Sequence, residues 1–247
     1  MKPKVSIITV VFNSEDLIEK TIKSVKSQTY QNIEYLIIDG ASTDKTLEII
    51  KKYKVDFLLS EPDKNLYDAM NKGIKYASGE YLYFLNAGDI FFENNSLEKM
   101  ISLSKGEDFL YGRTIFVDRF RRKRHYCKQT PYPDKLSYKS FINGMVISHQ
   151  AMIVKKNITP QFEVDKWKVS SDIEWSIRIL KDADSKCFLD EPFCLFYDMG
   201  HSKHFKTRVW GLIERFLICC YFFGFFNTFI TQFQILYKFF RYPKRYC

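Results

Sequence analysis

The 247-residue chain is poor in glycine and has no glycine-rich phosphate-binding loop. Its 10 glycines form neither a G-x-G-x-x-G nor a G-x-x-x-x-G-K-[ST] pattern. Such patterns let backbone amides approach phosphates closely, so the dinucleotide-binding and P-loop classes lose their main support. A sugar nucleotidyltransferase is disfavoured for a similar reason, because residues 10–15 contain no Gly-rich loop for a nucleoside triphosphate.

The sequence contains no paired cysteine motif, and its first apolar run does not match a signal peptide. The six cysteines form no C-x-x-C pair and no metal-finger spacing, which is typical of reduced thiols in a cytosolic chain and predicts no disulfide framework. The first apolar run, residues 5–12, is too short and wrongly flanked for a signal peptide. We interpret this run as a buried strand.

Acidic residues are scarce in two parts of the chain. The net charge of +9 is concentrated in residues 119–128, with +6, and residues 201–247, with +7. Residues 1–118 and 129–200 are slightly acidic. A chain with 46% hydrophobic and 27% charged residues is globular, which excludes disorder, collagen-like repeats and a simple coiled coil.

Short apolar runs alternate with amphipathic stretches up to residue 89, and this pattern predicts βαβ units with a parallel sheet. The expected strands there cover residues 5–12, 35–38, 57–60 and 81–85, and helices lie between them, the first of them capped by Asn13 or Ser14. Further on we expect helices over 97–103 and 172–180, strands over 109–117, 147–154 and 193–197, and a loop over 119–135.

Carboxylates follow two of the predicted parallel strands. Asp39 ends the second strand and Asp89 follows the fourth. Ligands of open α/β sheets bind beyond the carboxyl ends of the strands. Hard divalent cations such as Mg²⁺ prefer oxygen ligands and bridge phosphates, so this edge predicts a nucleoside diphosphate bound through a cation.

Six segments then resemble motifs of one family, in the same order along the chain. They are VSIITVVFN (5–13), IIDGASTD (37–44), SEPDKNLYDAMNKGI (60–74), FLNAGD (84–89), SHQA (148–151) and VSSD (169–172). Over about residues 4–202 the chain resembles glycosyltransferase family 2, and in particular its bacterial surface-polysaccharide members of the colanic-acid type.

The resemblance implies a fold and a division of the chain. The fold is the α/β GT-A nucleotide-diphospho-sugar transferase fold, with a mostly parallel central sheet flanked by helices and a C-terminal aromatic and basic helical appendage. A catalytic domain over 1–204 would comprise a nucleotide-binding half (1–95) and an acceptor-binding half (96–204). Residues 205–247 would form amphipathic, membrane-associating helices.

The resemblance also implies roles for individual residues. Asp89 would ligate Mg²⁺ or Mn²⁺ on the diphosphate, and Asp172 would be the catalytic base of an inverting transfer. A base is needed because the acceptor hydroxyl must lose its proton as it attacks, and the cation stabilises the leaving diphosphate. The donor nucleotide would contact Val10, Phe12, Asp39, Asp68 and Asn86, with Asp39 at the nucleobase.

The chain departs from the family pattern at two positions. Asn86 and Asp89 replace the paired aspartates of many members, which leaves one strong metal ligand. His201 interrupts the usual glycine pair before a serine, so it is a weak second candidate for the metal or diphosphate, or a plain loop residue.

The acceptor side is expected to include His149, Gln150, Arg122 and Arg124. The arginines belong to a basic run that could bind an anionic acceptor or simply be solvated. Each candidate also has a purely structural alternative: a strand-end turn for Asp39 and Asp89, a helix start for Asp172, a packed core histidine for His149 and a solvated helix carboxylate for Asp68.

The aromatic stretch 216–230 lies between basic residues, and polar residues interrupt it. A spanning helix needs about 20 predominantly apolar residues. We therefore expect attachment to an anionic membrane surface. A helix pair packed on the catalytic domain, an oligomer contact and a true span are the alternatives.

The sequence therefore predicts a glycosyltransferase on the cytoplasmic face of the inner membrane. Its donor is a nucleotide-sugar, with a UDP-sugar favoured, and its acceptor is a glycan or a polyprenyl-pyrophosphate-linked glycan. No nucleic-acid partner is expected, and the oligomeric state is open. The alternative from another class is a non-catalytic membrane- or nucleic-acid-binding adaptor that uses residues 119–128 and the C-terminal tail.

Overall fold

The computed structural model describes residues 2–117, 123–124, 136–197 and 205–241. Only the backbone is described at 123–124, 205–208 and 235–241. The elements are β1 (Val5–Val11), α1 (Ile18–Lys26), β2 (Ile33–Asp39), α2 (Thr46–Ile50), β3 (Phe57–Ser60), α3 (Leu66–Tyr76), β4 (Tyr81–Phe84), β5 (Ile90–Phe91), α4 (Ser96–Leu103), β6 (Phe109–Val117), β7 (Lys123–Arg124), the 3₁₀ helices η1 (Tyr138–Asn143) and η2 (His149–Ala151), β8 (Met152–Lys155), the 3₁₀ helix η3 (Lys156–Ile158), α5 (Ser171–Asp182), β9 (Lys186–Tyr197), α6 (Phe205–Phe223) and α7 (Phe225–Arg241).

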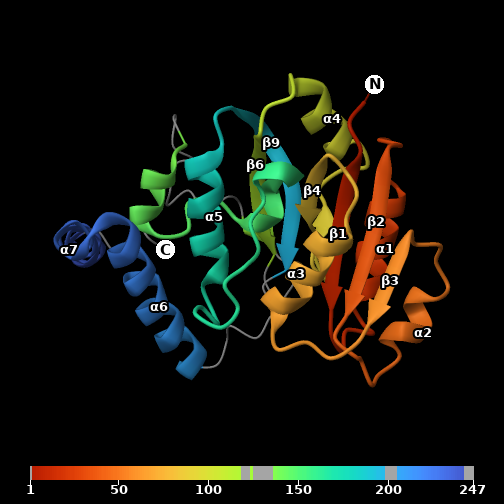
Figure 1. The fold of residues 1–247 in the computed structure, drawn as a ribbon, viewed down its shortest axis with the longest axis horizontal. Coiled ribbons are helices and arrows are strands. Elements are labelled where there is room, and N and C mark those ends of the chain that lie inside the picture. Colours follow the sequence, from red (N-terminus) through yellow and green to blue (C-terminus); the bar gives the residue numbers. More distant parts are fainter. Residues whose placement is uncertain (1, 118–122, 125–135, 198–204, 242–247) are drawn as a thin grey trace.

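A central sheet with the order β3-β2-β1-β4-β8-β6-β9-β5 organises the molecule, and β7 pairs with β6 (Figure 1). The four N-terminal strands are parallel, as predicted. Beyond β4 the sheet is mixed, because β8 runs antiparallel to both β4 and β6 while β9 is parallel to β6. The α/β class of the GT-A type is confirmed, and its parallel part comprises β1 to β4.

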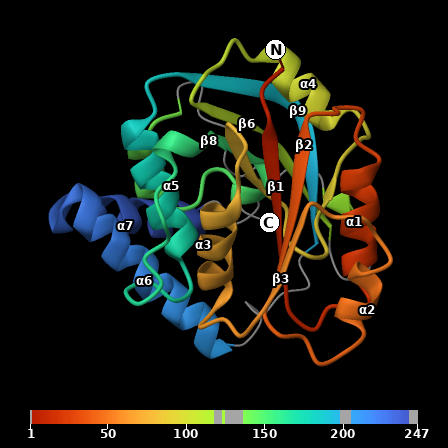
Figure 2. The same cartoon turned by 45° about the vertical axis from the view of Figure 1, so that its right-hand side comes forward.

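Helices cover both faces of the sheet (Figure 2). One buried cluster joins the strands to α1, α2 and α4, and the other joins them to α3, α5 and the inner side of α6. β1 is buried along its whole length because it lies between β2 and β4 with helices on both faces. Alternate β1 residues therefore enter opposite clusters: Ile7 faces α1 and Ile8 faces α3.

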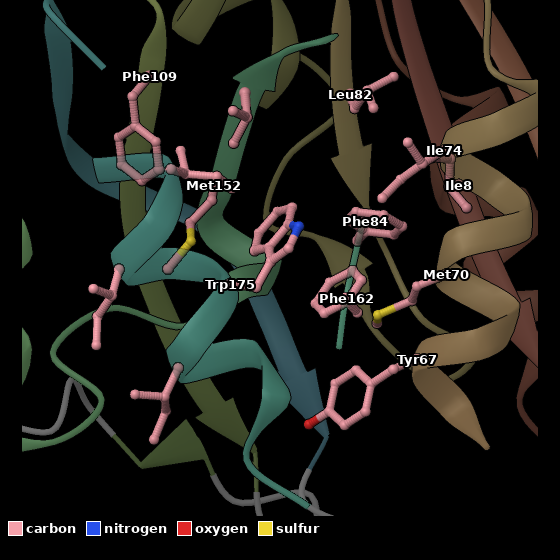
Figure 3. Packing of buried hydrophobic residues seen from close by; sticks show 14 of the residues in the cluster. Ile8, Tyr67, Met70, Ile74, Leu82, Phe84, Phe109, Met152, Phe162 and Trp175 are labelled. Atoms are coloured by element: carbon pink, nitrogen blue, oxygen red, sulfur yellow. The ribbon is translucent and has the colours of Figure 1, made fainter. Parts of the chain in front are cut away.

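An aromatic cluster fixes α5 against α3. Phe162 stacks on Trp175 of α5 at 4.7 Å between ring centroids and on Tyr67 of α3 at 5.3 Å. Figure 3 shows these rings with Phe84 of β4 between the two helices. Such pairs add to the free energy gained by burying the rings. The cluster therefore sets the position of the first turns of both helices, where Tyr67 and Asp172 lie.

Two local predictions were wrong. Residues 147–154 do not form one strand: Ala151 N–H donates to the Ser148 carbonyl, which closes the turn η2, and the strand begins only at Met152. The first helix begins at Ile18 without a side-chain cap, because Asn13 Oδ1 accepts the Thr43 N–H of the neighbouring loop and the Ser14 hydroxyl donates to the Phe12 carbonyl. Both differences come from hydrogen bonds that hydrophobic periodicity does not report, a local one in η2 and one between loops at Asn13.

The C-terminal helices lie outside α5 and meet at Gly224, whose φ of +81° favours glycine. On α6, Gly211, Glu214, Ile218 and Cys219 are buried, whereas Trp210 and Leu217 are exposed. No helix in the described residues is long and apolar enough to cross a membrane.

The close approach of α3 to β1 generates a stability prediction. A Cβ added at Gly73 would overlap the Ile8 side chain. We expect Gly73→Ala to lower the free energy of unfolding by about 1 kcal/mol or more, because overpacking costs about 1–3 kcal/mol and outweighs the helix propensity gained. Urea unfolding followed by circular dichroism measures this change.

The control is Lys75→Ala, an exposed substitution one half-turn away on the same helix. It should change stability by less than about 0.5 kcal/mol. A Gly73→Ala protein as stable as the wild type would show that the contact between α3 and β1 is not tight.

Candidate active site

Two loops form the first part of the site, at the carboxyl ends of β1 and β2. Asn13 and Ala41 have positive φ values of 43° and 62° in these loops. Thr43 N–H donates to Asn13 Oδ1 at 2.8 Å, and Asn13 N–H donates to Ser42 Oγ. The left-handed conformations are thus held by hydrogen bonds between the loops, and such strain is common at functional sites.

Asp39 is fully buried at the end of β2. Its carboxylate accepts the Ser42 N–H at 3.0 Å, the Ser42 hydroxyl and the Ser60 hydroxyl. This is the turn-stabilising role expected of an aspartate after a strand. Of the other predicted donor residues in this loop region, Val10 is buried, whereas Phe12 is 54% exposed beside Gly40 and can offer a ring face to a base.

Asp68 lies in the first turn of α3, and its carboxylate accepts the Lys64 N–H at 3.0 Å. The neighbouring Lys72 Nζ lies 4.0 Å from Asp68 and 2.6 Å from Asp63. Asp63 lies beside Gly40, so the charged side chains Asp63, Asp68 and Lys72 are next to the loop that follows β2. Sequence reasoning missed Asp63 and Lys72, although both belong to the segment 60–74 that carried the family resemblance.

Asn86 and Asp89 lie in the loop after β4, beside η2. Antiparallel pairing aligns Tyr83 with Ile153, so the residues that follow β4 meet the residues that precede β8. His149 Nε2 lies 3.3 Å from Asn86 Nδ2. The predicted residues Asn86, Asp89, His149 and Gln150 are therefore brought together by one strand pair.

Burial dominates the chemistry of Asp89, which is 4% exposed. Desolvation raises the pKa of this carboxyl to about 7, although the Tyr197 N–H, His149 and Gln150 each favour the ionised form. The Tyr197 N–H lies 3.2 Å from Asp89 Oδ1. Tyr197 is a backbone contributor that no side-chain motif could have indicated.

Asp172 extends the group of polar side chains from the start of α5. Its Oδ2 lies 3.5 Å from His149 Nδ1, and its Oδ1 accepts the Ile173 N–H at 3.0 Å. The Tyr67 hydroxyl, buried on α3, lies 3.4 Å from the same Oδ1. Asp172 retains 23% side-chain exposure, so it is reachable by a substrate while its neighbours hold it in place.

One placement of the ring proton of His149 satisfies most of the hydrogen bonds that join Asn86, His149 and Asp172. If His149 carries its ring proton on Nδ1, that N–H points to Asp172 and Nε2 accepts from the Asn86 amide. Asn86 Oδ1 is then turned away from the histidine. Within the described residues this buried oxygen has no hydrogen-bond partner.

The donor set suits a divalent cation that also binds a diphosphate. A buried carboxylate whose pKa is raised and an unpartnered amide oxygen are hard oxygen ligands, and Mg²⁺ commonly takes one or two carboxylates with substrate phosphates and waters. No group of three or more His, Cys, Asp or Glu side chains in the described ranges could hold a metal alone. A cation held by Asp89 and Asn86 would therefore take further ligands, such as the oxygens of a bound diphosphate.

Three predicted residues cannot be placed with the rest. His201 and Arg122 lie outside the described residues. Arg124 is described only as backbone, where it pairs with Phe116 at the edge of the sheet.

The raised pKa of Asp89 predicts how stability depends on pH. Between the usual value of 3.8 and about 7, the folded metal-free protein holds a proton that the unfolded chain releases. Stability therefore falls as pH rises through this window, by at most about 1.4 kcal/mol per pH unit. Asp89→Asn removes this dependence. The unfolding free energy of the wild type minus that of the variant should therefore fall from pH 5 to pH 8.

Urea unfolding of chelator-treated protein at several pH values measures this difference. Asp184→Asn, at an exposed aspartate, is the control and should track the wild type at every pH. A wild-type minus Asp89→Asn difference that stays constant with pH would contradict the buried, proton-binding state of Asp89.

Comparison with known proteins gives a consistent result. The model of the family "Glycosyl transferase family 2" matches residues 6–160. An uncharacterized glycosyltransferase of Mycobacterium tuberculosis is 30% identical over 231 residues, covering 86% of this chain and 82% of the relative. The Escherichia coli UDP-Glc:alpha-D-GlcNAc-diphosphoundecaprenol beta-1,3-glucosyltransferase WfgD is 29% identical over 224 residues, covering 86% of each chain.

A solved structure of residues 1–349 of Staphylococcus aureus TarS in complex with UDP has a TM-score of 0.71 at 17% identity. The match covers 97% of this chain and 72% of TarS 1–349. It covers 44% of a longer TarS structure. At this identity the likeness bears on the fold alone. The family match and the relatives show that this chain is a glycosyltransferase that belongs to glycosyl transferase family 2.

Proposed function

We propose that the protein transfers a sugar, with inversion, from a UDP-sugar to a lipid-linked glycan of bacterial surface-polysaccharide synthesis. The observation that carries this proposal is the series of side-chain contacts that joins Asn86 to His149 and His149 to Asp172, with the buried Asp89 beside it. It supplies oxygen ligands for a diphosphate-bound cation and a carboxylate for the acceptor within one polar group. The substrate class is supported by WfgD, which uses UDP-Glc and a diphosphoundecaprenol-linked acceptor, and by the structure of TarS in complex with UDP.

In this proposal Asp172 removes the proton from the acceptor hydroxyl. The Ile173 N–H and the Tyr67 hydroxyl lie near Oδ1, and His149 lies near Oδ2, so the carboxylate is oriented before the acceptor arrives. His149 and Gln150 lie between the proposed base and the proposed position of the donor diphosphate. The carboxylate Asp89 and the amide oxygen of Asn86 would hold Mg²⁺ or Mn²⁺, which supplies Lewis-acid stabilisation of the leaving diphosphate.

The donor nucleotide is proposed to lie at the β1 and β2 loops. Phe12 offers its exposed ring there, and Asp39 lies beneath the Ser42 turn. Since Asp39 already accepts three hydrogen bonds, binding of the nucleobase to this carboxylate would replace or share one of them.

Asp172→Asn tests the assigned base. We expect UDP release from UDP-glucose or UDP-N-acetylglucosamine, with N-acetylglucosaminyl diphosphoundecaprenol as acceptor, to fall by at least about 100-fold, since a positioned base contributes about 10²–10⁴-fold. Binding of UDP, measured as a thermal shift with Mn²⁺, should persist because Asp172 lies on the acceptor side.

Asp182→Asn, at the exposed end of the same helix, is the matched control and should retain activity. An active Asp172→Asn enzyme would reject the base. Loss of both activity and UDP binding would instead mean that the substitution damages the donor side.

The C-terminal helices are proposed to attach the protein to the cytoplasmic face of the inner membrane. We call their exposed apolar residues the aromatic face; they are Val209, Trp210, Leu212, Ile213, Leu217, Tyr221, Phe225, Phe226, Phe229, Ile230 and Phe233. Residues 201–247 carry a net charge of +7. An aromatic surface within a basic segment matches an anionic lipid surface, where rings enter the interface and basic side chains meet headgroups.

Substitution of the aromatic face tests this attachment. Removal of residues after Arg215 would also remove the buried Ile218 and Cys219, so Trp210→Ser with Phe226→Ser is the sharper change. These side chains are 59% and 80% exposed. Their loss should weaken binding to phosphatidylglycerol vesicles by more than about ten-fold, because each buried aromatic contributes about 1.5–3 kcal/mol.

Co-sedimentation with vesicles measures the binding. Leu103→Ser, 48% exposed on the distant α4, is the control and should bind as the wild type does. Unchanged sedimentation of the double variant would reject the aromatic face as the anchor. A lipid-free dimer that this variant abolishes would assign the face to a second copy of the chain.

A further inference from the structure

Glu214 is a buried carboxylate with an unusual position. It is the single acidic residue of the basic segment 201–247, and it is 8% exposed on the inner side of α6. Buried carboxylates are costly unless they accept hydrogen bonds. Its neighbours Gly211 and Ile218 share this buried side, whereas Trp210 and Leu217 lie on the aromatic face.

Three consecutive backbone amides satisfy Glu214. Lys168 N–H donates to Oε1 at 2.9 Å, and Val169 and Ser170 N–H donate to Oε2 at 2.8 and 2.9 Å. The Ser170 hydroxyl donates to the Gly211 carbonyl at 3.2 Å. Four hydrogen bonds thus attach α6 to residues 168–170, and the three bonds to the carboxylate are of the stronger, charge-assisted kind.

The attached segment leads directly into the proposed base. Ser170 precedes the first residue of α5, and Asp172 is the second residue of that helix. The Tyr67 hydroxyl joins the two, since it lies 2.9 Å from the Val169 carbonyl oxygen and 3.4 Å from Asp172 Oδ1. A displacement of residues 168–170 therefore displaces Asp172 relative to His149 and Tyr67.

We propose that Glu214 is a positioning residue for Asp172, and that it couples the geometry of the base to the docking of α6 on an anionic lipid surface. The inference rests on the proposed function, because it regulates that same site. One side of α6 holds the segment before α5, and the other side carries the aromatic face. Binding of the face to lipid restrains α6 and, through Glu214, residues 168–172.

Hydrogen exchange tests this coupling without any substrate. Exchange of the amides at 168–170 in the wild type should slow when phosphatidylglycerol vesicles are added. Glu214→Gln keeps the side-chain shape but turns an amide N–H₂ toward one of the three donors. It should speed this exchange by about ten-fold or more, since one buried N–H donor loses its acceptor, and should abolish the vesicle effect while the variant still sediments with vesicles.

A merely structural role gives a different result. In that case Glu214→Gln lowers the melting temperature, and the exchange at 168–170 does not depend on vesicles in either protein. This outcome would overturn the coupling. The matched control is Glu174→Gln, which removes a buried carboxylate bonded to Arg178 on α5 and should leave the vesicle effect intact.

Kinetics test the positioning. Glu214→Gln should lower kcat by about ten-fold with the KM for the donor unchanged, because small misplacements of a reacting group have effects of this order or larger. In the Asp172→Asn background the same change should have no further effect, since residues that act as a unit are not additive. Equal losses in both backgrounds would overturn a role through Asp172.

Gly211→Ala provides a second variant if Glu214→Gln does not fold. Its Cβ would lie 3.3 Å from Val169 Cγ1, so it presses on the side chain of the same segment while it favours the helix. It should also lower kcat without changing UDP binding, and an unchanged kcat would overturn the inference. If instead Asp172→Asn proves active while vesicles still slow exchange at 168–170, the proposed function fails and the coupling stands.

Discussion

The antiparallel pairing of β8 with β4 is the contact on which the candidate site depends. The first three parallel strands and β4 deliver loops to one edge of the sheet, as in other α/β proteins. Only the return of β8 along β4 places η2 beside the loop that follows β4. His149 thereby lies between Asn86 and Asp172, which come from different halves of the chain.

The electrostatics of this polar group follow from burial. Asp89 is desolvated at the point where the sheet, η2 and β9 meet, and its neighbours offset only part of the cost of its charge. A cation bound with a diphosphate would provide the missing compensation. Asp172, by contrast, lies at a helix start with partial exposure and neighbours that orient it. The two carboxylates thus have environments suited to different tasks.

The two sides of α6 differ, because one is buried against the rest of the fold and the other exposes large apolar side chains. Ile218 belongs to the main hydrophobic cluster, and Glu214 binds the backbone before α5, so α6 is part of the catalytic body. Its opposite side exposes large apolar residues of the kind that a globular surface rarely concentrates. The segment predicted as a separate appendage over 205–247 is therefore, in α6, packed into the body of the fold beside α5.

The sequence by itself determined the α/β class, the ranges of the parallel strands and most polar residues of the site, because strand periodicity and residues at strand ends are local features. Asp39 and Asp89 were indicated by their places after strands, whereas Asn86, His149, Gln150 and Asp172 were named from the resemblance to the family motifs. Only the tertiary structure decided that Asp89 and the latter four side chains meet, that Tyr67 and Tyr197 contact them and that Glu214 binds the backbone before Asp172. These contacts join residues 45 to 108 positions apart in the chain, which local patterns do not specify. The one local signal for Glu214 was its isolation as an acid in a basic segment.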